Sequence, residues 1–423
     1  MPKQRTRICI EGWYYLMVLA FIIGGAVMRE INLLLFVAGI LIGPLVISWR
    51  IVGRSLQQVS AYRKLPAGIS AGEMLIAEVT VTNGRRKGDA WGVTVEDCLK
   101  LASADVGTSA RDAWVSGESV RVFFPKIAAQ ATNTANYQGR LDRRGRYEVG
   151  PLMISTRFPL GLMRRTITMP DKQFLYVYPR MGRMTAAWMQ MVQPSRIGSR
   201  RSQQRQGSRE GEFHSLRDHR SGDSQRWIHW RTTARRNRLT VKQFERQQSQ
   251  NLELLLDLWV PNNLSEELRA AQQRQIEQII SFAATVCADH CRRGSSRLLL
   301  GVAGANVETV GGVTSMGLLE ECLEKLAVAR ASETDRLPGL LDDVLTDVHP
   351  ESRVVVLSPR QTDLSDTERF ESIWQKPRER STLGRVLCLP ASSPEFRGCF
   401  ELQERVESKV RNSPAGFHVR RPA

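Results

Sequence analysis

Two almost uninterrupted apolar stretches stand at residues 8–28 and 31–47, separated by Arg29 and Glu30. At 1.5 Å per residue in a helix, each stretch is long enough to cross about 30 Å of hydrocarbon. A cleaved signal peptide is the alternative, but the first stretch is too long for one and a second stretch follows at once. The pattern therefore predicts a transmembrane α-hairpin whose two helices contact the lipid bilayer, with residues 1–64 as hairpin and juxtamembrane linker.

Charged and aromatic residues flank these stretches as expected at a membrane surface. The turn between them carries one Arg and one Glu, whereas basic residues gather at the opposite ends. By the positive-inside rule, both termini and the soluble domains are expected in the cytoplasm. The basic residues are Lys3, Arg5, Arg7, Arg50, Arg54, Arg63 and Lys64, and the interfacial aromatics are Trp13, Tyr14, Tyr15 and Trp49.

Residues 65–180 have a different pattern, in which short alternating apolar runs are broken by Gly, Asn and Pro. The runs lie at 74–83, 91–99, 119–127 and 173–179. Alternation with a period of two is typical of half-buried strands, and strands at this spacing are typical of sandwiches. We expect an all-β, immunoglobulin-like sandwich over residues 65–180.

Strand and helix patterns alternate over residues 251–423. This order predicts an α/β domain with a parallel, doubly wound sheet. The expected strands are 251–260, 296–304, 352–359 and 384–390, and the expected helices are 265–292 and 315–331.

The remaining segment, residues 181–250, is a basic connector followed by a compact polar motif. Residues 196–246 contain 14 Lys or Arg against 5 Asp or Glu, so +9 of the formal net charge of +17 lies in about an eighth of the chain. Such a local excess implies an anionic partner: lipid headgroups, nucleic acid or an acidic protein surface.

The stretch 211–245, GEFHSLRDHRSGDSQRWIHWRTTARRNRLTVKQFE, predicts a helix within this basic segment. Asp223 or Ser224 suits its N-cap, and Asn237 suits the left-handed residue at its end. Trp227, Trp230 and Ala234 then share a face, which we interpret as the buried anchor. Asp218 and Asp223 are expected to hold some of the surrounding arginines in bidentate pairs, from a set of Arg226, Arg231, Arg235, Arg236 and Arg238.

Neither histidine nor cysteine spacing gives a strong metal signal. His214, His219 and His229 lack the spacing of a metal-binding helix and are expected to be structural or exposed. Cys287, His290 and Cys291 lack a fourth ligand nearby. The 7 scattered cysteines show no framework spacing, which predicts free thiols in cores and a reducing compartment.

The motif resembles the bacterial family called domain of unknown function 58, whose pattern has an Arg-Asp pair, a Gly-Asp, an Arg, an Ile-x-Trp and an Ala-Arg. The stretches RRGRYEVGP (143–151) and RFPLGL (157–162) look like further family signatures, although the second has Leu160 where the family has Phe. The residues that carry the core resemblance are Arg217, Asp218, Gly222, Asp223, Arg226, His229, Trp230, Arg231, Ala234 and Arg235.

This resemblance implies a bacterial inner-membrane protein whose α/β part is similar to von Willebrand factor A domains. Genes of such proteins commonly neighbour MoxR-type AAA+ ATPases, which implies an adaptor role beside such an ATPase. Many von Willebrand factor A domains bind a divalent cation through an Asp-x-Ser-x-Ser loop. Here Asp257 lacks both serines, and Ser358, Pro359 and Arg360 follow the later strand, so we predict no metal site and no cofactor.

We therefore expect a membrane-anchored, non-enzymatic adaptor or scaffold working with a MoxR-type ATPase in envelope-protein assembly or maturation. No P-loop, no His-Glu-x-x-His and no Cys–His nucleophile pair is present in the sequence. Two alternatives stay open. The Arg-rich segment 196–246 is able to bind nucleic acid or another anionic surface, and Asp218, Asp223 and His229 are the candidates for an unrecognised active site.

Overall fold

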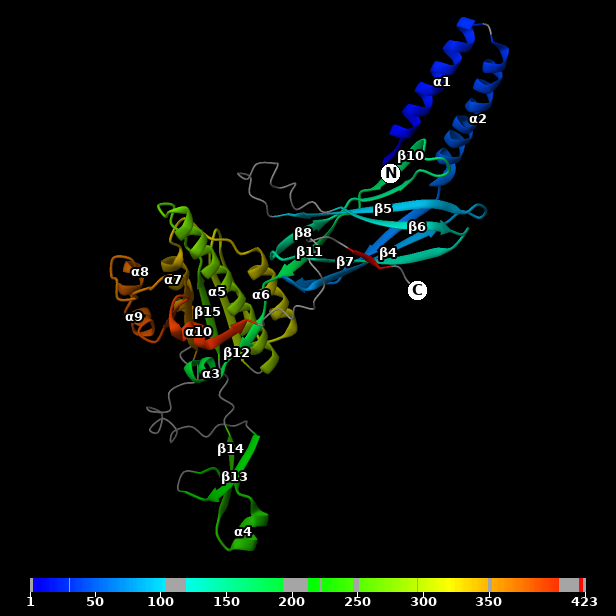
Figure 1. The fold of residues 1–423 in the computed structure, drawn as a ribbon. Helices are drawn as coiled ribbons and strands as arrows, with labels where there is room; N and C mark the ends of the chain where they lie inside the picture. Colours follow the sequence, from blue (N-terminus) through cyan, green and yellow to red (C-terminus); the bar gives the residue numbers. More distant parts are fainter. Residues whose placement is uncertain are drawn as a thin grey trace. The chain divides into compact units, whose positions relative to one another are not determined.

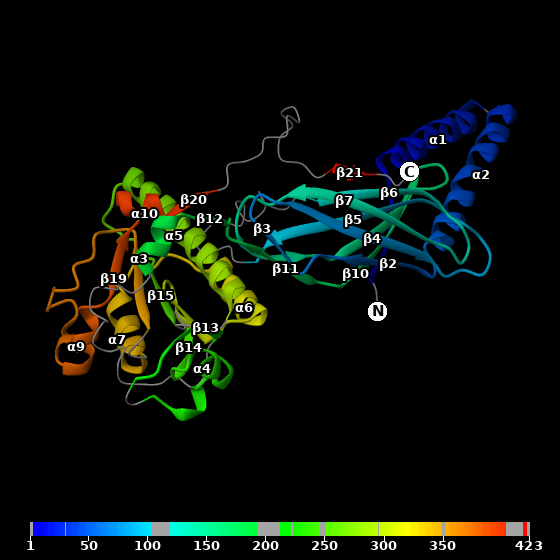
Figure 2. The same ribbon diagram turned by 90° about the horizontal axis from the view of Figure 1, so that it is seen from below.

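The computed structural model describes residues 3–29, 31–102, 119–192, 212–220, 223–245, 251–294, 296–348, 352–402 and 418–420. The chain forms two compact units. The first comprises residues 1–180, 323–328 and 404–423, and the second comprises residues 181–322 and 329–403. Figure 2 shows the same chain from below.

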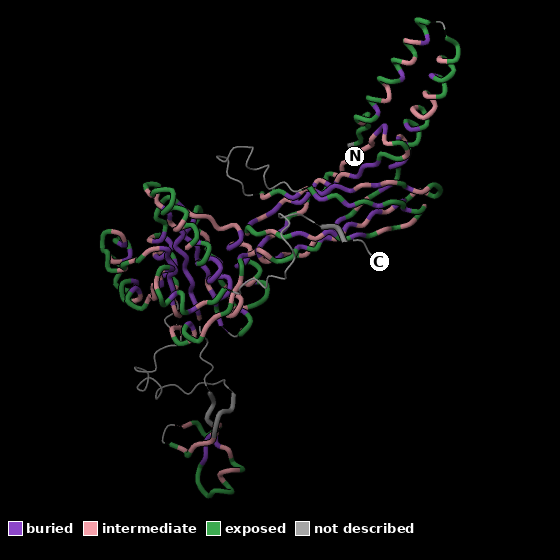
Figure 3. Tube along the Cα trace, in the orientation of Figure 1, coloured by how far each residue is buried: buried purple, intermediate pink, exposed green. Residues whose placement is uncertain are grey.

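The first unit contains two long helices, α1 (Ile10–Arg29) and α2 (Asn32–Ser55), which lie side by side (Figure 1). The Tyr15 hydroxyl of α1 donates a hydrogen bond of 2.7 Å to the Leu41 carbonyl of α2. Most of their apolar side chains are exposed, as the green of both helices in Figure 3 shows, with Phe21 at 84%. Both helices are long and apolar enough to cross a bilayer.

Both outer ends of this hairpin continue into strands of the same unit. Strand β1 (Lys3–Ile8) precedes α1 and pairs with β10 (Met163–Met169), whereas β2 (Val59–Lys64) follows α2 and pairs with β4 (Met74–Asn83). Both strands lie within residues 1–64, for which the sequence pattern predicted only the hairpin and a linker. The basic character of β1 concealed its strand from a search for apolar alternation.

Two sheets form the rest of this unit. The larger has the order β1-β10-β9-β5-β8-β11-β3, with β6 on β5, and the smaller has the order β2-β4-β7-β21. Buried residues of both sheets form one cluster, which includes Val79 and Val81 of β4 and Val95 of β5. The predicted β-rich region is thus confirmed. Its other strands are β3 (Gly68–Ser70), β5 (Ala90–Leu101), β6 (Ser119–Ile127), β7 (Thr132–Arg140), β8 (Gly145–Val149), β9 (Leu152–Thr156), β11 (Gln173–Tyr178) and β21 (His418–Arg420).

A buried ion pair lies inside this β region. Arg63 is fully buried, and its Nη1 donates to Asp97 Oδ1 at 2.5 Å while its Nη2 donates to the Val149 carbonyl at 2.8 Å. The Tyr137 hydroxyl donates to the other Asp97 oxygen at 2.7 Å. Arg63 was expected among the basic residues at the membrane surface, but its charge is neutralised in the core because β2 turns this side chain inward.

The second unit contains a five-stranded sheet of order β17-β16-β15-β18-β19. Strands β15 (Leu252–Asp257), β16 (Arg297–Ala303), β18 (Arg353–Ser358) and β19 (Leu387–Pro390) run parallel, but β17 (Val307–Val313) is antiparallel to β16. The sheet is therefore mixed rather than parallel. Only residues 304–306 join β16 to β17, which is too short for a crossover connection.

The second unit also contains helices. Residues 182–192, which precede the motif in the chain, belong to the same unit. Strand β12 (Gly182–Met184) pairs with β20 (Phe400–Leu402), and Trp188 of α3 (Ala186–Val192) meets Phe282 edge to face at 5.1 Å. The other helices are α5 (Glu266–Arg293), α6 (Met316–Val328), α7 (Leu337–Asp347), α8 (Glu371–Trp374), α9 (Pro377–Leu383) and α10 (Pro394–Cys399).

All seven cysteines are free thiols, as predicted. Four of them are buried and three are partly buried. The buried ones are Cys287, Cys291, Cys322 and Cys399.

Candidate functional site

The motif forms a hairpin with a short helical insertion. Strands β13 (Glu212–Asp218) and β14 (Thr240–Glu245) pair antiparallel, and a 3-10 turn (Gln225–Trp227) and α4 (Trp230–Arg236) stand between them. The predicted continuous helix is wrong, because Ile228 is extended and bridges Val241 while the His229 N–H donates to the Thr240 carbonyl at 2.8 Å. Asn237 ends α4 in the left-handed conformation, with φ of 50°.

A bidentate ion pair fixes the entry to this insertion. Arg217 at the end of β13 donates from Nη1 to Asp223 Oδ2 at 2.8 Å and from Nη2 to Oδ1 at 2.6 Å. The Arg220 backbone N–H also donates to Asp223 at 2.8 Å, and the hydrogen bond from Arg217 is the main reason why the Asp223 pKa is lowered. Asp223 was expected to pair with the helix arginines, but β13 brings Arg217 to it first.

His229 caps α4 in place of the predicted Asp223 or Ser224. Its Nδ1 accepts the Thr232 backbone N–H at 3.2 Å and lies 2.8 Å from the Thr232 hydroxyl. Nδ1 must therefore carry a lone pair, which assigns the ring proton to Nε2. The ring thus satisfies one of the free N–H groups at the helix start.

The anchor of this segment differs from the prediction. Thr240, Val241 and Ile228 are buried, whereas Trp227 is half-buried. Trp230 is 66% exposed, and Ala234 is also exposed. The break at Ile228 removes the helical spacing that would have placed both tryptophans on one face.

Around α4 this leaves a surface that we call the basic face: Trp230, Arg226, Arg231, Arg235, Arg236 and Arg238, all exposed. Within the described residues, no carboxylate forms an ion pair with these arginines. Asp218 is exposed too, and its carbonyl accepts from Arg217 at 3.2 Å. Gly222, the side chain of His214 and most of the basic connector lie outside the described residues.

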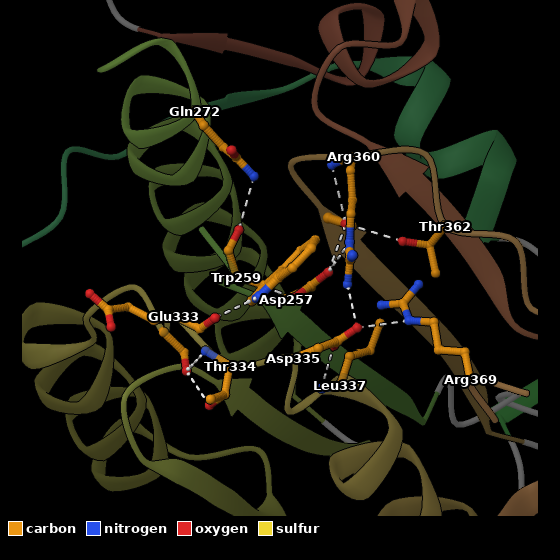
Figure 4. A network of polar contacts seen from close by, with 12 residues as sticks. Asp257, Trp259, Gln272, Glu333, Thr334, Asp335, Leu337, Arg360, Thr362 and Arg369 are labelled. Atoms are coloured by element: carbon orange, nitrogen blue, oxygen red, sulfur yellow. Dashed lines mark hydrogen bonds and ion pairs between the residues drawn. The ribbon is translucent and has the colours of Figure 1, made fainter. Parts of the chain in front are cut away.

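A second polar cluster lies at the carboxyl ends of β15 and β18 (Figure 4). Asp257 ends β15 with no exposed surface, and its Oδ2 accepts the Ser358 hydroxyl at 2.9 Å and Arg360 Nε at 3.4 Å. Its Oδ1 accepts the Trp259 N–H at 3.2 Å. Burial raises the Asp257 pKa, and the nearby Arg360 charge opposes this rise.

Arg360 also joins Asp257 to a second carboxylate. Its Nη2 donates to Asp335 Oδ2 at 2.7 Å, its guanidinium stacks 3.8 Å from the Trp259 ring centre, and Arg369 Nε donates to the same Asp335 oxygen at 2.8 Å. Burial raises the Asp335 pKa, but hydrogen bonds from Arg369 and Arg360 outweigh it and the net shift is downward. The positive charge of the Arg360 guanidinium thus lies between the carboxylates of Asp257 and Asp335.

Asp257 and Arg360 were identified from the sequence, whereas Asp335 and Arg369 were not. Both belong to loops or turns without periodicity, so no pattern linked them to β15. Among the residues that the structure describes, no group of three or more His, Cys, Asp or Glu side chains is arranged to hold a metal ion.

Comparison with known proteins places both clusters in one region. The model of a family described as a protein of unknown function, DUF58, matches residues 215–373. The uncharacterized protein YeaD of Bacillus subtilis (strain 168) is 24% identical over 251 residues, which cover 57% of this chain and 55% of YeaD. The match therefore spans about half the length of this relative.

Similarity to solved structures is weak. The CARDB domain of a Pyrococcus furiosus protein is 10% identical, with 28% of this chain and 94% of that domain covered and a TM-score of 0.18. The sporulation control protein Spo0M of Bacillus subtilis is 9% identical over 38% of this chain and 58% of Spo0M, with a TM-score of 0.17. Scores this low do not establish a shared fold. The region that holds both the motif and the Asp257 cluster thus matches the DUF58 family model.

Proposed function

We propose that this chain is a membrane-anchored, non-enzymatic adaptor that binds an acidic protein partner through the basic face around α4. Helices α1 and α2 serve as the anchor in a bacterial inner membrane, and the soluble units stand on its cytoplasmic side. The proposal includes an immunoglobulin-like sandwich for the β region and a von Willebrand factor A-like fold for the α/β region.

One observation carries the proposal. The internal ion pair of the motif stabilises the motif itself, and the other arginines of the motif remain exposed. Both oxygens of Asp223 are used by Arg217, so the loop before α4 is fixed without help from Arg231 or Arg235. Exposed Trp230 stands beside them, and Trp and Arg are enriched where protein partners bind most strongly. A preorganised surface of this kind loses less entropy on binding.

The polar groups once considered for catalysis have structural contacts. Asp223 is engaged by Arg217, and His229 Nδ1 caps α4. These contacts favour a binding role for the motif. The family resemblance makes a MoxR-type AAA+ ATPase the expected partner, in envelope-protein assembly or maturation.

Site-specific photo-crosslinking tests the proposal. A photoreactive amino acid at position 230 of the full chain in membranes is expected to crosslink a MoxR-type ATPase, identified by mass spectrometry. Arg231→Ala with Arg235→Ala should reduce the crosslink severalfold. Arg274→Ala with Arg269→Ala, two exposed arginines of α5, is the matched control and should not reduce it.

Two results contradict the adaptor. Equal crosslinking in both double variants shows that the basic face does not select the partner. A crosslink that nuclease treatment abolishes shows that nucleic acid, the alternative occupant of segment 196–246, is bound instead.

A further inference from the structure

An open pocket of about 250 Å³ lies in the first unit, where the C-terminal end of α2 meets the β region. Arg50 and Arg54 line it from the last turns of α2, and Arg85 lines it from the turn after β4. Its other wall is aromatic, because Trp91 of β5 and Phe158 stack with ring centres 5.9 Å apart. The pocket therefore joins a cationic wall to an apolar one.

The charges in the pocket are positive on balance. Asp89 is its acidic lining residue, but it is paired with Lys126 at 2.9 Å and accepts the Ala129 N–H at 3.2 Å. Arg50 and Arg54 form no ion pair within the described part of the chain. Arg85 Nε is buried and has no hydrogen-bond partner there.

The end of a helix is ordinarily unfavourable for an anion, because its free carbonyls carry partial negative charge. Here two arginines cover those carbonyls. Arg85 Nη2 donates to the Ser55 carbonyl, and Arg165 Nη1 donates to the Gly53 carbonyl. An anion beside Arg50 and Arg54 would consequently meet guanidinium groups rather than carbonyl oxygens.

The position of the pocket along α2 matches the headgroup region of a bilayer. The apolar part of α2 runs from Asn32 to Trp49, which is about 27 Å at 1.5 Å per residue and close to the hydrocarbon thickness. Trp49 is 63% exposed, as an interfacial aromatic would be. Arg50 follows it directly, so a membrane-spanning α2 places the pocket at the level of the lipid phosphates.

We propose that this pocket binds the phosphate of an anionic phospholipid headgroup, with phosphatidylglycerol as the probe. Guanidinium forks match phosphate oxygens in pairs, so Arg50, Arg54 and Arg85 hold the phosphate. Trp91 and Phe158 contact the apolar start of the acyl chains. This site rests on the membrane anchoring in the proposed function, but it does not depend on the protein partner.

The test uses the full chain in nanodiscs with equal phosphatidylglycerol and phosphatidylcholine, followed by native mass spectrometry of the lipids that it retains. Wild-type protein is expected to retain phosphatidylglycerol over phosphatidylcholine on the order of fivefold. Arg50→Gln with Arg54→Gln should lose this preference. These two side chains are exposed and form no ion pair in the described structure, so the fold does not depend on them.

The matched control is Arg86→Gln with Lys87→Gln, which removes the same charge from exposed positions beside the pocket and should keep the preference. Equal loss in both double variants would show general basic attraction and overturn the site, as would no preference in the wild type. Displacement of the lipid by millimolar inorganic phosphate would assign the pocket to free phosphate. Failure of the chain to sediment with membranes would contradict the membrane anchoring on which the lipid site rests. A missing crosslink at position 230 would contradict only the proposed adaptor role.

Discussion

His229 is the N-cap of α4, and its ring accepts a hydrogen bond from the first turn of that helix. We expect His229→Ala to destabilise α4 by about 1 kcal/mol, because the Thr232 N–H loses its acceptor. His229→Asn should retain most of the stability, because Asn is a favourable N-cap. Hydrogen exchange of the Thr232 and Thr233 amides measures the effect. Equal protection in the Ala and Asn variants would show that the ring caps nothing.

At this scale the sequence identified the right residues but not their partners. Arg217 and Asp223 were both in the predicted motif, yet their pairing depends on the strand direction at β13, which local spacing does not encode. Trp230 was assigned to the core because helical spacing was extended through Ile228. One extended residue changed the face and left Trp230 exposed.

Glu253, a buried carboxyl of β15, contributes a pH dependence to the stability of the α/β region. Burial of Glu253 in β15 raises its pKa from 4.5 to about 7. The native state therefore holds a proton that the unfolded chain has lost between these values, and the associated stability disappears as pH rises through 7. We expect Glu253→Gln to be more stable than wild type at pH 8 by on the order of 1 kcal/mol.

The measurement is urea unfolding of the detergent-solubilised chain at pH 5 and pH 8. The two proteins should differ little at pH 5, where Glu253 is protonated in the fold. A constant difference at both pH values would assign the effect to packing instead of ionisation.

At the scale of elements, the polar cluster at the ends of β15 and β18 allows a prediction of how much stability single and double variants lose. Arg360→Ala leaves Asp257 as a buried carboxylate without a charged partner, and we expect a loss of about 3 kcal/mol. Asp257→Asn in the Arg360→Ala background should recover part of this loss, because no buried charge then remains. Unfolding midpoints of the two single variants and the double variant measure the coupling. Additive losses would show that Arg360 and Asp257 do not act as a pair.

The sequence predicted elements well where one physical signal dominated. The alternating run at 74–83 is β4, and the apolar run at 352–359 contains β18. The prediction failed where pairing decides the structure. Strand β1 is polar and depends on β10 for its hydrogen bonds, and the direction of β17 depends on the three-residue link before it.

For the chain as a whole, the hairpin topology constrains membrane orientation. Strands β1 and β2 flank α1 and α2 and both enter sheets of the same unit. If the helices span the bilayer, the N-terminus and the β region must therefore share one side, and the turn near Arg29 must lie on the other. The basic residues Arg5, Arg7 and Arg50 favour the cytoplasm for the shared side.

Cysteine labelling tests this orientation. A membrane-impermeant maleimide should label Met28→Cys in intact spheroplasts, because Met28 is 89% exposed beside the turn. It should label exposed Ser60→Cys of β2 only after permeabilisation. Wild-type protein, whose native thiols are partly or fully buried, supplies the background. The reverse pattern would place the soluble units outside and exclude any cytoplasmic ATPase as a partner. Labelling of both sites in intact spheroplasts would mean that α1 and α2 do not cross the membrane.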